Sequence, residues 1–97
     1  IVELNTKDAY AIPMEHPMVT TLKKVAEEVT GFTIPVYGST GGTDMSHIQR
    51  AGVPMCALGP GGPGNNVHAP DERLPIPSLQ KLTKICALTA LEICKPS

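Results

Sequence analysis

The chain has 97 residues, which allow one compact domain and little more. Hydrophobic residues make up 41% of it, enough for a core, so an intrinsically disordered chain is excluded. The formal net charge is −1, from 8 Lys and Arg against 9 Asp and Glu, which argues against binding to nucleic acid or to an acidic membrane surface. No apolar run approaches the roughly 20 residues of a membrane-spanning helix, and no signal-peptide pattern is present. Because the first residue is Ile1 rather than Met, we expect the chain to be a fragment.

The N-terminal third predicts a strand end and a helix. Apolar residues at 1, 2 and 4 indicate a strand at Ile1–Leu4, followed by a turn-rich connection to Pro13. From Met14 onward apolar residues recur at helical spacing, with Pro17 near the start of the helix and Gly31 at its end. The opposite face is interpreted as solvated and carries four charged residues, Lys23, Lys24, Glu27 and Glu28.

The middle of the chain alternates short apolar segments with glycine. Phe32–Tyr37 is β-branched and aromatic, which predicts a short or edge strand because Pro35 cannot donate to a ladder. A glycine-rich loop then opens a short helix, Met45–Ala51, which Gly52 closes. Val53–Leu58 predicts a further strand.

The last third consists of a long loop and a helix. Gly59 to Pro77 shows no periodicity, and a run of this length without an element of its own is usually functional. Pro77–Cys94 has one broad apolar face and predicts a helix.

Strands and helices in this alternating order predict an α/β fold, a partial sheet flanked by helices, with further strands supplied by sequence not present here.

The first loop that could bind a ligand is Gly41-Gly42-Thr43-Asp44. Glycines let a backbone pass close to a ligand, and free N–H groups at a helix start favour an anion such as a substrate carboxylate. The alternative is that Thr43 or Asp44 caps the helix with its side chain, and the two roles are compatible.

The second loop runs from Gly59 to Glu72 and contains His68. A histidine in a glycine-rich loop after a strand lies where α/β proteins place their ligands. The alternative is a surface or hydrogen-bonded structural histidine. Asp71 and Glu72 could orient the imidazole or simply cap the segment after them.

The remaining histidines and the cysteines are weaker candidates. His47, one turn into the short helix, could reach the same site, whereas His16 is expected to be exposed. The three cysteines show no metal-ligand spacing and are interpreted as small core hydrophobes. Their use favours a reducing, cytoplasmic compartment. They are Cys56, Cys86 and Cys94.

Taken in order, these segments resemble the C-terminal part of the catalytic domain of the dinuclear-zinc peptidases and deacylases of clan MH, which include acetylornithine deacetylase, succinyl-diaminopimelate desuccinylase, aminoacylase and glutamate carboxypeptidase. The resemblance implies that residues 1–97 are a C-terminal segment of such a zinc-exopeptidase-like domain, with 1–13 as the exit from a lid domain not present here. The segments that carry it are Gly41–Asp44, the short helix, Ala51–Pro54, Leu58–Gly61 and His68–Glu72.

The resemblance implies metal-dependent hydrolysis of an amide bond in N-acyl amino acids or short peptides. It identifies His68 with the histidine that binds the second of two zinc ions, with cobalt and manganese as alternatives. Gly42 and Thr43 correspond to the backbone that meets the substrate carboxylate, and Asp44 to an acid that supports the site. The family's other ligands and its general base come earlier in its chain, so no residue here is assigned a catalytic role. Because a catalytic zinc needs about three protein ligands, the isolated segment is expected to be inactive and to hold no metal by itself.

The implied partners are a small amino-acid or peptide substrate and the remainder of the same catalytic domain. A homodimer through the lid domain is a further option. The alternative function, from a different class, is a non-catalytic small-molecule-binding or assembly module that keeps the glycine-rich loop.

Overall fold

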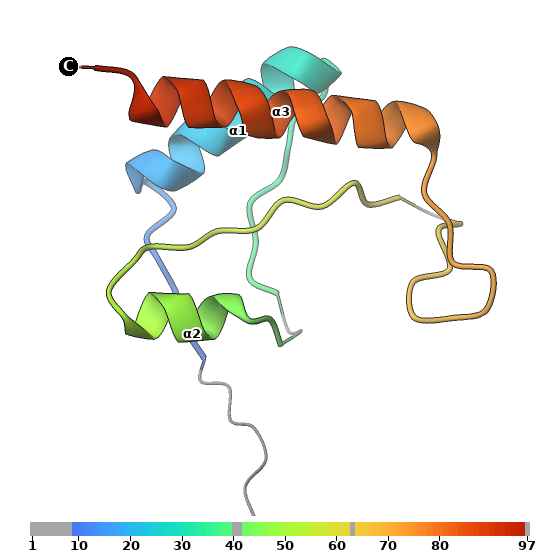
Figure 1. Cartoon of the computed structure of the whole chain (residues 1–97), viewed down its shortest axis with the longest axis horizontal. Helices are drawn as coiled ribbons and strands as arrows, with labels where there is room; N and C mark the ends of the chain where they lie inside the picture. The colour runs from blue at the N-terminus through green and yellow to red at the C-terminus, as the bar shows by residue number, and fades with distance from the viewer. Residues whose placement is uncertain (1–8, 40–41, 63, 97) are drawn as a thin grey trace, which may run out of the picture.

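The computed structural model describes residues 9–39, 42–62 and 64–96. Within them the chain forms three helices, and all three predicted helices are thereby confirmed. Figure 1 shows α1 and α3 side by side, and its colours show that they run in opposite directions. They are the two described helices that contact each other, while α2 lies away from both. The helices are α1 (Pro17–Thr30), α2 (Met45–Arg50) and α3 (Ile76–Cys94).

Both ends of α1 are closed by the residues next to it. At the start, the ring Nδ1 of His16 accepts a hydrogen bond from the Met18 N–H at 3.1 Å, and Pro17 begins the helix with a backbone angle that suits it. At the end, Gly31 adopts a left-handed conformation (φ 75°) and donates its N–H to the Glu27 carbonyl at 2.8 Å. The expectation that His16 is exposed was wrong, because its ring is half-buried as the helix cap.

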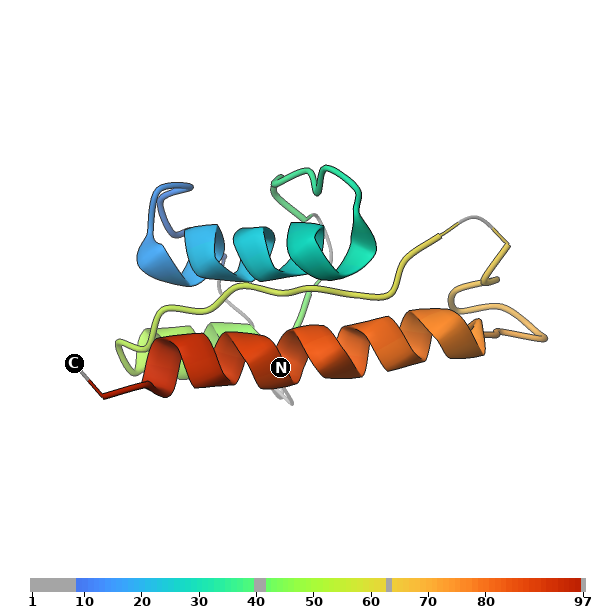
Figure 2. The same ribbon diagram turned by 90° about the horizontal axis from the view of Figure 1, so that it is seen from above.

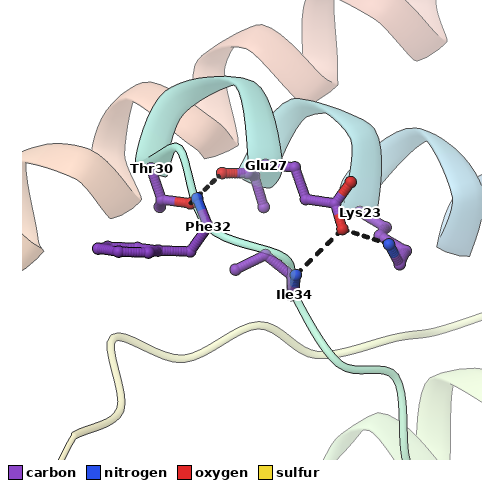
Figure 3. Close-up of polar contacts among 6 residues, drawn as sticks. Lys23, Glu27, Thr30, Phe32 and Ile34 are labelled. Atoms are coloured by element: carbon purple, nitrogen blue, oxygen red, sulfur yellow. Dashed lines mark hydrogen bonds and ion pairs between the residues drawn. The ribbon is translucent and has the colours of Figure 1, made fainter.

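Glu27 lies on the polar face of α1, as predicted, where Lys24 and Glu28 are exposed. Its carboxylate accepts two hydrogen bonds through Oε1, one from Lys23 Nζ and one from the Ile34 N–H at 3.0 Å (Figure 3). Thr30 adds a hydroxyl that accepts from the Phe32 N–H at 3.2 Å. These contacts direct the chain after α1 back along the helix.

The core lies between α1 and α3 and is small. Val25 and Ala26 of α1 meet Ile85 of α3, and each is at most 5% exposed. The side chains around them are partly buried, and two of these come from the extended segments rather than from helices. The partly buried set is Leu22, Val29, Ile34 and Leu58.

The predicted α/β fold with a partial sheet is contradicted: the described residues form helices and extended segments but no strand. Phe32–Tyr37 and Val53–Leu58, the two predicted strands within the described residues, are extended but unpaired. The reason is that a strand is defined by its partner, whereas apolar and β-branched composition is a property of the segment alone. Pro35 and Pro54 also lack a ladder donor, and the Ile34 N–H is used by a carboxylate. The predicted strand Ile1–Leu4 lies outside the described residues.

Much of the apolar surface of the described residues is in contact with water, because more of their large hydrophobic side chains are exposed than buried. The most exposed are Met14, Phe32, Tyr37, Val67, Ile76 and Leu91.

Candidate functional site

The end of the glycine-rich loop leads directly into α2. Gly42 and Thr43 are exposed, and their backbone N–H groups make no hydrogen bond to the described residues. The Thr43 carbonyl accepts from the Ser46 N–H at 3.5 Å and from the Ser46 hydroxyl at 3.2 Å. Asp44 occupies the cap position of α2 without a side-chain capping hydrogen bond. The predicted side-chain cap by Asp44 is therefore not formed, and the donors of Gly42 and Thr43 are available to an anion. Gly41 lies outside the described residues.

His68 lies in a turn on the loop that leads into α3. Its backbone is left-handed (φ 59°), its side chain is exposed, and its ring makes no hydrogen bond or ion pair with the described residues. The Ala69 N–H donates to the Asn66 carbonyl at 3.0 Å and closes the turn around it. Neither Asp71 nor Glu72 bonds to the imidazole, so the predicted orienting role is not formed in this conformation. Both ring nitrogens are open to a ligand.

The two loops do not come together in this fold. In both Figure 1 and Figure 2 the loop around His68 lies beyond the first turn of α3, at the right-hand edge, whereas α2 lies in the left half of each view. His47 is exposed on α2. Among the described residues, no three of the His, Cys, Asp and Glu side chains gather into a group that could hold a metal. The His68 loop therefore does not by itself form a metal site among the residues that the structure describes.

Two shallow hollows lie beside the His68 loop. Their volumes are about 350 and 460 Å³, which is the lower part of the range of small-molecule sites. Asn65, Arg73 and Leu74 line both of them, and Glu72 adds a carboxylate to the larger one. The polar groups that converge here belong to the predicted functional loop.

Sequence reasoning did not single out Arg73. Its Nε donates to the Gly64 carbonyl at 2.8 Å, and its own N–H donates to the Asn65 carbonyl at 2.9 Å. It therefore joins the two ends of the segment 64–73 that carries His68. An arginine nine residues after a glycine has no periodic signature, so only the folded loop identifies the contact.

The cysteines divide into two kinds. Cys56 is half-buried in the extended segment, and burial raises the pKa of its thiol. Cys86 and Cys94 are exposed on α3, so interpreting them as core residues was wrong. The buried residues of α3 are Ile85 and Thr89, and neither thiol is among them.

No helix among the described residues combines the length and the apolar composition that a bilayer crossing requires.

Comparison with known proteins matches nearly the whole chain to one family. The model described as "Peptidase family M20/M25/M40" matches residues 2–92, a range that includes both loops. A protein of Bacillus subtilis (strain 168) named "Putative dipeptidase YtjP" is 31% identical over 93 residues, which cover 96% of this chain and 20% of that protein. The chain thus spans about a fifth of the length of this relative. No solved structure matches.

Proposed function

The chain belongs to peptidase family M20/M25/M40, and from that membership we propose that it forms part of a metal-dependent hydrolase that cleaves an amide bond in N-acyl amino acids or short peptides. The observation that carries the proposal is the family match over residues 2–92, which includes both candidate loops. The Bacillus subtilis relative is named a dipeptidase, which supports short peptides among the substrates. A short peptide and an N-acyl amino acid share a scissile amide near a free carboxylate, so one site can serve both.

In this proposal His68 supplies one metal ligand. Neutral imidazole is a preferred zinc ligand, and the exposed ring of His68 has both nitrogens open, so the donor fits one position of such a site. It fits no more than one, because the described residues provide no group of three ligands and a catalytic zinc needs about three. When bound, a pair of zinc, cobalt or manganese ions would supply a polarised carbonyl and an activated water. The task of His68 is to hold one of these ions in position.

Gly42 and Thr43 are proposed to bind the substrate carboxylate. Both residues are exposed, and their backbone N–H groups make no hydrogen bond to the described residues. The absence of a side chain at Gly42 leaves room for a close approach. Two charge-assisted hydrogen bonds from this backbone would fix the carboxylate and thereby orient the amide bond relative to the metal.

The partner that completes the site is proposed to be the remainder of the same catalytic domain, of which residues 1–97 are the C-terminal segment. Most of the large hydrophobic side chains of the described residues are exposed, as expected of a segment that another part of the domain covers. On α3, Leu79, Cys86 and Ile93 are exposed at seven-residue intervals, so they share one side of the helix.

We expect Cys86 to react rapidly with a maleimide in the 97-residue chain and slowly in the full-length protein. Equal rates would contradict a covered α3.

The cytoplasm is the compartment that we propose. Cys56, Cys86 and Cys94 are free thiols, as is usual where the surroundings are reducing.

The proposal is tested with the full-length protein. We expect it to hydrolyse dipeptides or N-acyl amino acids and to lose that activity on chelation, with recovery after zinc is added back. His68→Ala should lower turnover by orders of magnitude while the protein still folds, and His16→Ala is the matched control that keeps turnover. Activity that survives chelation would refute the metal-dependent mechanism. Substrate binding without turnover under any metal condition would instead favour the alternative, a non-catalytic binding module.

A further inference from the structure

Arg73 closes the loop that carries His68. Its backbone N–H donates to the Asn65 carbonyl at 2.9 Å, and its side-chain Nε donates to the Gly64 carbonyl at 2.8 Å. Two adjacent carbonyls at one end of the segment 64–73 are thus bonded to a single residue at the other end. The backbone and the side chain of Arg73 thus both bond to the start of the loop, and Arg73 joins its two ends.

The backbone inside this loop adopts conformations that L-residues usually avoid. Asn66, His68 and Asp71 all have positive φ, at 52°, 59° and 60°. Such conformations cost free energy and persist only where the surrounding structure imposes them. Apart from the two Arg73 bonds, the hydrogen bond that spans this stretch is the one from the Ala69 N–H to the Asn66 carbonyl. Arg73 therefore contributes a large share of the restraint on a strained backbone.

The direction of the His68 ring depends on this restraint. The ring itself makes no hydrogen bond to the described residues, so its direction is set by the backbone that bears it. A left-handed residue that relaxes toward an ordinary conformation moves its Cβ to another side of the chain. Loss of the closure would leave His68 facing the metal in only a fraction of the molecules. The apparent affinity for the metal falls in proportion to that fraction.

We propose that Arg73 is a positioning residue, which holds the His68 loop in the shape that presents the imidazole to a metal. The inference rests on the proposed function, in that it takes His68 as a metal ligand. The guanidinium itself touches no metal and no substrate atom. It acts through the Gly64 carbonyl, in the way that groups around a metal site orient the ligands that bind it.

The experiment measures zinc affinity in the full-length protein by competition with a chromophoric chelator, which needs no enzymatic turnover. Arg73→Ala should weaken one zinc site about 10- to 100-fold, the usual effect of removing a group that orients a ligand. Arg73→Lys keeps a donor that can reach the Gly64 carbonyl and should recover part of the loss. Lys81→Ala, the matched control, removes an exposed cation of α3 that bonds to none of the described residues and should bind zinc as the unaltered protein does.

A second readout reports on the loop without metal. In the metal-free protein, Arg73→Ala should speed the amide hydrogen exchange of Ala69 and of residue 73, while the amides in the middle of α3 stay protected. This local change separates a loosened loop from general unfolding.

The outcomes distinguish this inference from the function on which it rests. If His68→Ala loses one zinc site while Arg73→Ala binds zinc normally or exchanges its loop amides at the original rate, the positioning role is refuted and the proposed function stands. An Arg73→Lys variant no better than Arg73→Ala would also refute it. If His68→Ala keeps both zinc sites at full affinity, His68 is not a ligand, and the proposed function loses its metal site together with this inference.

Discussion

Ile85 is the single contribution of α3 to the fully buried cluster, and the change to test is Ile85→Ala. The side chain is 4% exposed and packs against Val25 and Ala26 of α1. The substitution removes three buried carbons, which at about 0.8 kcal/mol each gives about 2.4 kcal/mol of lost transfer free energy. The cavity left behind raises the expected cost to about 3 kcal/mol. Since a domain of this size is stable by roughly 5–15 kcal/mol and this cluster is small, the loss is a large part of the total.

The assay is urea unfolding of the 97-residue chain followed by far-ultraviolet circular dichroism. Leu91→Ala is the matched control, since it also removes three carbons from α3 but from a side chain that is 68% exposed. With about a third of the side chain buried, its expected cost is roughly 0.8 kcal/mol. We therefore expect a clear fall in the urea midpoint for Ile85→Ala and a small one for Leu91→Ala. Equal falls would refute the placement of Ile85 in the contact between α1 and α3.

Three further predictions concern other parts of the chain. The hydrogen bond from Lys23 and then that from the Ile34 N–H lower the pKa of Glu27, so its stabilisation is complete above the unfolded pKa and is lost as the pH falls through the lower folded pKa. Glu27→Gln should therefore flatten the fall in urea midpoint on acidification. Gly31→Ala forces a side chain into a left-handed backbone and should cost about 1 kcal/mol in the same unfolding assay, whereas Gly38→Ala, where φ is not positive, should cost little. Burial raises the pKa of the Cys56 thiol, so mass spectrometry should find this residue labelled by iodoacetamide after the exposed thiols on α3.

The helices could be predicted from the sequence because their signals are local. Apolar spacing, Pro17 at the start and Gly31 at the end specify α1 without reference to any other part of the chain. The same holds for α3, whose long apolar face is readable from its own residues. Here sequence and structure agree to within a few residues.

The strands could not be predicted in the same way. Phe32–Tyr37 and Val53–Leu58 have strand-like composition, yet a strand needs a partner whose position no local pattern contains. At Ile34 another hydrogen bond replaces strand pairing, because its N–H donates to the carboxylate of Glu27 on the preceding helix rather than to a neighbouring strand. The error in fold class comes from treating strand-like composition as strand pairing.

The candidate site divides along the same line. His68, Gly42 and Thr43 were found from residue types in an ordered set of loops, and their roles stay predictions. Arg73 was missed because its role depends on a contact across the loop with the Gly64 carbonyl. His16 was missed as a helix cap because histidine is not among the residues that usually cap helices. Contacts made through side chains across a turn leave no periodic trace in a sequence.

A zinc-loaded crystal of the full-length protein, measured at the zinc absorption edge, tests the role of His68 most directly. We expect an anomalous difference peak at about 2.1 Å from a ring nitrogen of His68, the distance of a zinc–imidazole bond. Zinc peaks at the metal centre with none within bonding distance of this ring would contradict it.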